Sequence, residues 1–442
     1  MNKLIQQTFY LIRQNPFYSL VAILGTAITI AFVMVIVMIY EFRSADIAPE
    51  TERSQLMYTG SSYTVKADGT DRMRGMGRTA FEALFVGLPD TEDATWCSSI
   101  EQVVVSLPTS SERYNFQVKN VASNWFSFFD YNFKAGRPFT QSEYDLGRSA
   151  FQTSESEFKI TELSDGSGYR HVVVSERIAR LFFGSAQEAL GKELLLNFSL
   201  SKVVGVVSDV SAIFQTAYAD VFQPFTLANE EGNYRGRVTN GLGGIRQGII
   251  KLSHDAMVKD VKKEVERREQ MLNQQHAEYQ FKLQELFTHT EYTFFRGSSI
   301  DARLVYVLLV LVLLVVPAIS ISGLVNAQMQ GRLSEIAFRN AYGASNVSII
   351  SNLFVEGLIN TIIGGILGFM LSYGLVWMGR VWLFGSGGVD LSGITMDMNL
   401  LLRPDLFIIV FMICLVFNLL AVLLPASIAV RKNIVVTLKG GE

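Results

Sequence analysis

Cysteine and histidine are scarce in this chain, and their scarcity argues against two kinds of site. The 442 residues include two cysteines, Cys97 and Cys414, and four histidines. Two cysteines so far apart in the sequence cannot build a framework of disulfides. The histidines occur neither in an HExxH pattern nor at the Cys/His spacings typical of zinc. The sequence therefore predicts no metal site.

Catalytic motifs are lacking as well. No nucleophile elbow of the form GxSxG and no set of kinase motifs is present. The segment Gly184–Glu193 contains a Gly-Lys pair, but Ala186 stands where a phosphate-binding loop has its first glycine. A net charge of -3 without a basic cluster argues against binding to nucleic acid. We therefore expect a protein that is not an enzyme and that binds no cofactor itself.

Long apolar runs are the dominant positive feature. Four runs carry no charged residue: Phe17–Tyr40, Leu304–Val325, Gly357–Gly379 and Leu406–Val430. Each is longer than the roughly 20 residues that an α-helix needs to cross a bilayer. The alternative for the first run is a cleaved signal peptide, but signal cores have only about 7–15 apolar residues. The sequence predicts four transmembrane helices, with a large polar insert between the first and the second.

Basic residues flank these runs on one side of the membrane. They are Lys3, Arg13, Arg332, Arg339, Arg431, Lys432 and Lys439. Lys and Arg in short loops stay in the cytoplasm, so both termini are predicted to be cytoplasmic and the insert extracytoplasmic. Apolar residues at helical spacing within residues 1–16 predict an amphipathic helix on the membrane surface, or else the first turns of the first span.

Within the insert, β-branched runs alternate with helical patterns. Val172–Ser175 and Lys202–Val207 are predicted strands, and Glu176–Phe183 is a predicted helix with Ser175 at its N-cap. From Asp255 to Phe287, apolar residues recur at near-helical spacing in a stretch rich in Lys, Glu, Gln and Arg. This pattern predicts one amphipathic helix that leads toward the second span. The insert is therefore expected to be an α/β domain.

The segment between the second and third spans has the pattern of a short helix followed by a turn. Ser334 can cap this helix, Gly343 can end it in the left-handed conformation, and Ser345 can cap the next span. The charged residues of the helix are Arg332, Glu335 and Arg339. The residue pattern leaves two interpretations open. In one, the helix binds a cytoplasmic partner; in the other, it lies on the lipid headgroups.

At this segment the chain resembles a known family. The run EIAFRNAYGASNVSIISNLFVEG, residues 335–357, resembles the REIGIRKALGAS signature of the FtsX/MacB-type permeases, the membrane subunits of one class of ABC transporters. The closing run LPASIAVRKNIVVTLKGGE resembles that family's PARRAARLDPVEALR segment. Four segments of the insert resemble successive blocks of the MacB-type periplasmic core domain, in the family's order: Val121–Phe139, Val172–Gly184, Ala189–Leu196 and Val203–Val210.

The resemblance implies a permease that dimerises, binds a cytoplasmic ABC ATPase and transmits the closure of that ATPase to the external domain. The coupling helix would be roughly Gly331–Tyr342, where Phe338 and Asn340 depart from the family's small aliphatic residue and Lys. The implied coupling residues are Arg332, Glu335, Ile336, Arg339, Tyr342, Gly343 and Ala344. Because only 16 residues precede the first run, the ATPase, which uses ATP and Mg, is expected on a separate polypeptide.

Four residues inside the predicted spans are candidates for helix packing or coupling. Gly364 and Gly368 form a GxxxG pair, which permits close contact either with a second permease or within one protomer. Glu356 lies in apolar sequence at the start of the third span, where a structural or coupling role near the cytoplasmic interface is expected. Pro317 in the second span marks either a bend or a packing position.

These features predict an α-helical membrane protein with four transmembrane helices and a large α/β extracytoplasmic domain. The expected boundaries are 1–16, 17–40, 41–303, 304–325, 326–348, 349–379, 380–405, 406–430 and 431–442. By resemblance, the function is that of a permease in a bacterial inner membrane, for efflux or envelope export. The alternatives are an FtsX-type transducer that controls a periplasmic enzyme, and an anchored sensor or scaffold. The expected partners are the ATPase, a second permease copy or paralogue, a periplasmic adaptor, an outer-membrane channel and the lipid bilayer.

Overall fold

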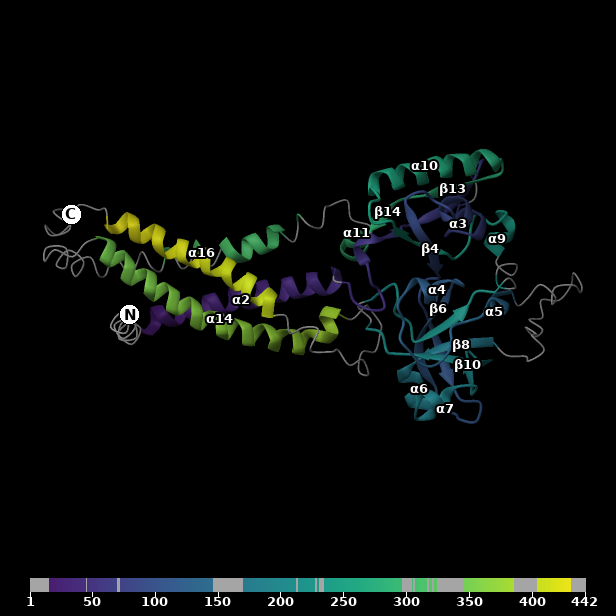
Figure 1. The fold of residues 1–442 in the computed structure, drawn as a ribbon, viewed down its shortest axis with the longest axis horizontal. Helices are drawn as coiled ribbons and strands as arrows, with labels where there is room; N and C mark the ends of the chain where they lie inside the picture. The colour runs from purple at the N-terminus through teal and green to yellow at the C-terminus, as the bar shows by residue number, and fades with distance from the viewer. Residues whose placement is uncertain are drawn as a thin grey trace, which may run out of the picture. The chain divides into compact units, whose positions relative to one another are not determined.

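The computed structural model divides into two compact units (Figure 1). It describes residues 16–44, 46–69, 72–145, 170–211, 214–226, 229, 234–295, 304, 307–315, 318–319, 322–323, 346–384 and 404–430. The first unit comprises residues 1–42, 300–383 and 397–442 and contains the long apolar helices. The second comprises residues 43–299 and 384–396 and contains the sheets.

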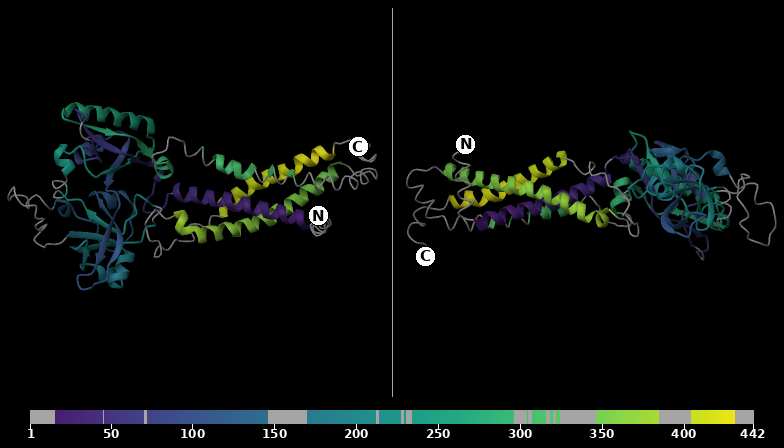
Figure 2. Two further views of the ribbon diagram at one scale, coloured as in Figure 1. Left: turned by 180° about the vertical axis from the view of Figure 1, so that it is seen from behind. Right: turned by 90° about the horizontal axis from the view of Figure 1, so that it is seen from below.

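The first unit is built from apolar helices: α2 (Pro16–Ser44), α14 (Asn346–Phe384) and α16 (Pro404–Val430). They run alongside one another (Figure 2). Within the described residues, Ser19–Glu41 and Phe354–Gly379 are long and apolar enough to cross a membrane, and Phe407–Ala421 is a shorter apolar helix. The run from Leu304 to Val325 is described only in pieces. The count of four spans therefore stays a prediction.

The second unit is an α/β domain. Its strands are β1 (Leu56–Thr59), β2 (Ser62–Lys66), β3 (Arg72–Arg74), β4 (Thr91–Cys97), β5 (Glu101–Ser106), β6 (Tyr114–Val121), β7 (Phe133–Gly136), β8 (Arg170–Ser175), β9 (Glu193–Leu196), β10 (Ser199–Val207), β11 (Val221–Pro224), β12 (Gln247–Leu252), β13 (Tyr279–Leu283) and β14 (Leu286–Thr288). Its helices are η1 (Arg53–Gln55), α3 (Arg78–Phe85), α4 (Trp125–Phe128), α5 (Gln141–Asp145), α6 (Glu176–Phe183), α7 (Ala186–Ala189), α9 (Tyr234–Val238), α10 (Val258–Gln275) and α11 (His289–Phe295).

Part of the main sheet closes on itself. The eleven-stranded sheet has the order β11-β8-β10-β9-β5-β6-β4-β12-β1-β14, with β7 beside β10. Because β11 pairs with both β8 and β6, the strands β11, β8, β10, β9, β5 and β6 form a ring of pairings. Alternate residues of these strands, among them Val103, Val105, Val172 and Val174, are fully or almost fully buried in one core. Val173, between two of them in β8, is also fully buried but belongs to a second core, so β8 has a hydrophobic core on each of its faces.

The other end of the sheet carries a second layer. The strands β13, β2 and β3 form a small antiparallel sheet. The helix α10 contributes Val261, Val265 and Leu272 to a core that it shares with Phe81 and Phe85 of α3. These α10 residues recur at near-helical spacing, so one face of an otherwise charged helix is buried.

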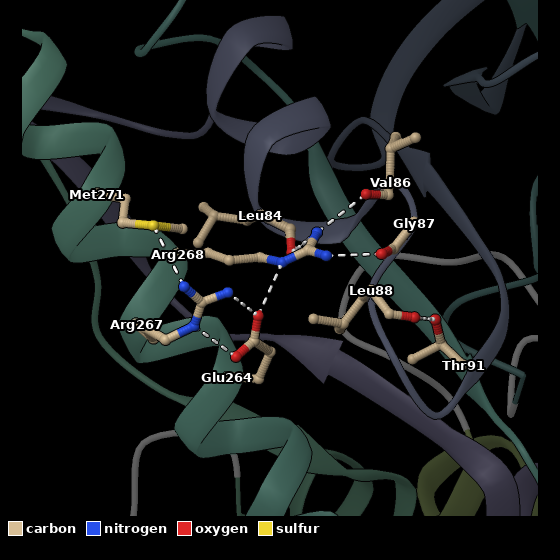
Figure 3. A network of polar contacts seen from close by, with 9 residues as sticks. All are labelled: Leu84, Val86, Gly87, Leu88, Thr91, Glu264, Arg267, Arg268 and Met271. Atoms are coloured by element: carbon tan, nitrogen blue, oxygen red, sulfur yellow. Dashed lines mark hydrogen bonds and ion pairs between the residues drawn. The ribbon is translucent and has the colours of Figure 1, made fainter.

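A single arginine ties α10 to the end of α3 (Figure 3). The Arg268 guanidinium donates hydrogen bonds to the carbonyl oxygens of Leu84, Val86 and Gly87 at 3.4, 2.9 and 2.6 Å. These carbonyls lie at the C-terminus of α3, where backbone acceptors lack helical partners and a positive charge is favourable. Arg268 therefore caps one helix while it belongs to another.

Most predicted elements of the insert are confirmed, and one is wrong in extent. The predicted strands correspond to β8 and β10, and α6 has the predicted bounds, with the Ser175 side chain accepting from the Ile178 amide. The helix predicted from Asp255 to Phe287 covers only Val258–Gln275 and is followed by β13 and β14. In β13, Tyr279 and Phe281 are buried and their neighbours are exposed. That alternation specifies a strand.

Candidate functional site

The predicted coupling segment lies outside the described residues. This holds for Arg332, Glu335, Ile336, Arg339, Tyr342, Gly343, Ala344 and Pro317. Their roles stay predictions. The predicted site residues that the structure describes, Glu356, Gly364 and Gly368, all belong to α14.

The GxxxG pair on α14 packs against α2 of the same chain. A Cβ atom added at Gly364 would lie 2.8 Å from the Cβ of Thr26, and one at Gly368 would lie 2.7 Å from the carbonyl oxygen of Ala27. Gly365, on the adjoining face, is similarly close to the Phe411 ring of α16. The glycines thus allow α14 to contact both neighbouring helices within one protomer, as small residues do in membrane helix bundles.

Glu356 belongs to a buried row along α14. Glu356, Asn360, Gly364, Gly368 and Ser372 recur every four residues, and all five are buried. Successive residues at this spacing are neighbours on the helix surface. The row therefore places polar and small side chains on the interior face of α14, with Glu356 one turn before Asn360. The structural or coupling role of Glu356 stays a prediction.

The two segments that connect the α/β domain to the apolar runs meet in one sheet. Among the described residues, the first strand after α2 is β1 and the last strand before residue 304 is β14. They are antiparallel neighbours, with Met57 opposite Thr288 and Tyr58 opposite Phe287. The described chain thus enters and leaves the sheet through one pair of neighbouring strands, with α11 directly after β14.

Two charged residues are buried in the segment between α2 and β1. The side chains of Glu50 and Arg53 are 2% and 1% exposed, and Arg53 Nε lies 3.0 Å from Glu50 Oε2. The backbone amide of Ala217 donates to Glu50 Oε1 at 2.9 Å. The Arg53 guanidinium also lies over the Phe214 ring, 4.4 Å from its centre. Removal of an ion pair from water costs several kcal/mol per ion, so both charges need these partners.

A tyrosine and a histidine link β1 to α11. The Tyr58 hydroxyl lies 3.0 Å from His289 Nδ1, and His289 Nε2 lies 3.3 Å from the Thr293 hydroxyl. The rings of Tyr58 and Tyr292 stack with centres 4.4 Å apart. Burial, together with the charge of Glu50, raises the pKa of Tyr58 well above its usual value. The hydroxyl therefore keeps its proton and remains a hydrogen-bond donor.

Nothing in the sequence singles out this junction. Glu50, Arg53, Tyr58 and His289 belong to no motif, and an Arg or Glu just after an apolar run is usually solvated. Their importance follows from burial and from pairing between distant segments. Both are properties of the fold.

The described part of the chain contains no group of three or more His, Cys, Asp or Glu side chains placed to hold a metal ion. Cys97 and Cys414 are buried in different units.

Two apolar helices of spanning length beside an α/β unit fit a membrane protein with a large domain outside the membrane. A family model described as a MacB-like periplasmic core domain matches residues 19–268, and an FtsX-like permease C-terminal model matches residues 307–434. The chain therefore belongs to the MacB/FtsX-type permease family, and its α/β unit is the extracytoplasmic core domain.

The curated relatives are longer proteins. The chain is 24% identical over 235 residues to the macrolide export ATP-binding/permease protein MacB of Burkholderia cenocepacia, covering 52% of this chain and 33% of that one. It is 21% identical over 315 residues to MacB of Acinetobacter baylyi, and this match covers 68% of this chain and 42% of that one. The chain thus spans between a third and under half of these relatives' length.

Solved structures that resemble this chain include two domains from outside the membrane. The periplasmic region of MacB from Actinobacillus actinomycetemcomitans matches with a TM-score of 0.34 and 15% identity, over 56% of this chain and 94% of that one. The extracellular domain of the noncanonic ABC-type transporter YknZ from Gram-positive bacteria matches with a TM-score of 0.32 and 14% identity, over 50% of this chain and all of that one.

Proposed function

We propose that this chain is the transmembrane subunit of a MacB-like ABC transporter. A separate cytoplasmic ATPase hydrolyses ATP with Mg, and its closure moves the periplasmic domain to drive efflux or export through the envelope. The observation that carries the proposal is the pairing of β1 with β14. Because of this pairing, movement of either segment that connects the core domain to an apolar run would displace the same two strands, β1 and β14.

The family match supports the remaining parts of the proposal. Membership in an ABC permease family implies an ATPase partner. The curated relatives are named macrolide export proteins, which favours export as the purpose of the movement that the ATPase drives. In this proposal the chain spans the inner membrane four times, dimerises with a second permease and contacts the ATPase through Gly331–Tyr342, with Glu335, Ile336 and Arg339 at the contact.

The test is affinity purification of the tagged chain from membranes in mild detergent, with mass spectrometry and an ATPase assay. We expect an ABC ATPase to co-purify with the wild type, and Glu335→Arg to reduce its recovery or its activity. The matched control is Glu266→Arg, the same charge reversal on the exposed face of α10. The proposal fails if no ATPase is recovered with intact protein, or if both variants behave alike.

The same purification distinguishes export from signalling. A co-purifying periplasmic adaptor or outer-membrane channel supports export. A cell-wall hydrolase in its place supports an FtsX-type transducer, in which the same stroke controls a periplasmic enzyme and nothing is transported. The absence of any ATPase leaves an anchored sensor as the better interpretation.

A further inference from the structure

The turn Phe214–Ala217 is held by buried polar groups from several distant segments. Lys119 Nζ donates to the carbonyl oxygens of Gln215 and Thr216, at 2.7 and 2.5 Å. The Tyr131 hydroxyl donates to the carbonyl oxygen of Ala217, while the amide of Ala217 donates to Glu50. Four consecutive residues thus receive contacts from Glu50 and Arg53 on one side and from β6 and the segment after α4 on the other.

This way of fixing a turn is energetically expensive. Lys119 is 3% exposed, and burial lowers the pKa of its ammonium group. With Glu50 and Arg53, three ionisable groups are withdrawn from water around one turn. Apolar side chains of similar volume would hold a turn at lower cost. Hydrogen bonds, unlike apolar contacts, depend on angle as well as distance. Each one here joins one side-chain atom to one backbone atom and therefore fixes the position of the turn relative to its neighbours.

The turn leads directly into the strand that closes the ring of pairings. After Ala217, the amide of Asp220 donates to the carbonyl oxygen of Gln117 in β6, and the amide of Ser175 donates to the carbonyl oxygen of Asp220. The strand β11 then pairs with β6 and β8. The hydrogen bonds of Ala217 and, three residues further along the backbone, those of Asp220 therefore connect the segment after α2 to the ring.

We propose that Glu50, Arg53 and the turn 214–217 form a coupling bracket, through which motion of the segment after α2 is passed to the ring of β11, β8, β10, β9, β5 and β6. The proposal rests on the proposed function, since it specifies how a stroke that arrives at the junction reaches the distal strands. Glu50 and Arg53 are positioning residues. They act through Ala217.

The first test uses hydrogen exchange in the full chain without nucleotide. In the double variant Glu50→Met/Arg53→Met, unbranched apolar side chains fill the space, and the sulfur introduced at position 53 keeps a contact with the Phe214 ring. We expect the Ala217 amide to exchange at least about ten-fold faster, as for loss of one hydrogen bond to a charged acceptor. The matched control, Arg78→Met/Glu82→Met, removes an ion pair that is half exposed. Its Ala217 exchange should equal that of the wild type.

The second test uses the complex with its co-purified ATPase, with and without ATP. In the wild type we expect ATP to change the exchange of peptides from β8 and β10. In the bracket variant, ATP hydrolysis should continue at the wild-type rate while this change in exchange is lost. A merely structural role would instead lower the thermal midpoint and reduce hydrolysis together. The proposal is overturned if the variant keeps the response of β8 and β10 to ATP.

Two further outcomes separate this inference from the proposed function. If the double variant does not fold, Tyr131→Phe removes the hydroxyl that donates to the Ala217 carbonyl oxygen and accepts from Trp125 Nε1, and a reduced response is expected there. If Tyr131→Phe leaves the response intact, the bracket is wrong. If no ATPase is recovered with the wild type, the proposed function fails. In that case the exchange rate of the Ala217 amide in the double variant is the measurement that decides whether Glu50 and Arg53 hold the turn.

Discussion

At Gly77 two segments that are far apart in the sequence cross with backbone against backbone. The Gly77 amide donates to the carbonyl oxygen of Leu242 at 2.7 Å. A Cβ atom at Gly77 would lie 2.1 Å from the Gly241 carbonyl oxygen and 2.5 Å from that of Gly243. Gly77 has an ordinary extended backbone conformation that any residue can adopt. Glycine is required here only because the neighbouring backbone leaves no room for a Cβ atom.

Gly77→Ala is therefore expected to destabilise the α/β domain by about 3 kcal/mol, as overpacking of a closed contact does. Gly69→Ala is the comparison, because Gly69 has φ +73° but no atom within 4 Å of a new Cβ. It should cost only about 1 kcal/mol, from backbone strain. Urea unfolding of the purified protein measures both. Equal losses would contradict the steric explanation.

Glu143 predicts a pH dependence of stability. It is 5% exposed, and His171 Nδ1 lies 2.7 Å and Arg137 Nη2 3.0 Å from its Oε1. Burial alone would raise the pKa of Glu143, but hydrogen bonds from His171, Arg137 and Thr140 outweigh it and hold the pKa well below its usual value. A depressed folded-state pKa gives stability that is present above the unfolded pKa of about 4.3 and is lost as the pH falls.

The stability difference between wild type and Glu143→Gln should thus be largest near neutral pH and shrink steadily below about pH 4. Urea unfolding at a series of pH values measures it. Glu264→Gln is the matched control. Arg267 lowers the pKa of Glu264 to about 2, but that pair lies at the surface, so its smaller effect should disappear in high salt. A difference at Glu143 that does not change with pH would refute the assignment.

At the scale of elements, Arg268 makes the packing of α10 on α3 testable. In Arg268→Lys, a single ammonium replaces the fork that reaches three carbonyl oxygens, so a loss of about 2 kcal/mol is expected. The adjacent Arg267, which is 58% exposed and pairs with Glu264, is the control. Arg267→Lys should leave the free energy of unfolding close to that of the wild type in the same urea titration. Similar losses in the two variants would show that Arg268 is not a cap.

The contact between α2 and α14 makes a second prediction for elements. Gly364→Leu places a side chain where Thr26 and the carbonyl oxygen of Ile23 already lie within about 3 Å of a new Cβ, so the two helices must separate. The protein should unfold at a lower detergent fraction in mixed micelles with sodium dodecyl sulfate. Gly374→Leu, where no atom lies within 4 Å, should behave as the wild type.

The same elements show which parts of the fold a sequence can reveal. The bounds of α6 follow from a local cap and local periodicity, and the structure reproduces them. The strand β13 was hidden because its polar residues continue the composition of α10, and five residues of alternation are a weak signal. The pairing of β1 with β14 joins positions more than two hundred residues apart, so no local pattern encodes it.

At the scale of the whole molecule, hydropathy distinguishes apolar runs from a polar insert, and the structure has two compact units, the second formed by residues 43–299 and 384–396. Family motifs identify the class of protein. The junction of Glu50, Arg53 and Ala217 was not predictable, since a buried charge and a solvated charge look alike in a sequence. The ATPase contacts around Glu335 stay a prediction.

The extracytoplasmic domain should fold without the apolar helices. A fragment of residues 46–295 contains the three hydrophobic cores and the strands β1 to β14, so we expect it to be soluble and to unfold cooperatively. A fragment of residues 46–284 lacks β14 and α11, which uncovers an edge of β1 and removes the His289 partner of Tyr58. It should aggregate. Circular dichroism on heating and size-exclusion chromatography measure both. Aggregation of the longer fragment would contradict its independence.

The adjacency of β1 and β14 also makes this domain exchangeable. Its entry and exit strands are antiparallel neighbours, about 5 Å apart across one hydrogen-bonded ladder, and a graft cut at residues 46 and 295 keeps the Glu50–Arg53 pair and α11 with them. The domain can therefore be transplanted between two helices of another permease as one cassette, without a cut inside residues 46–295.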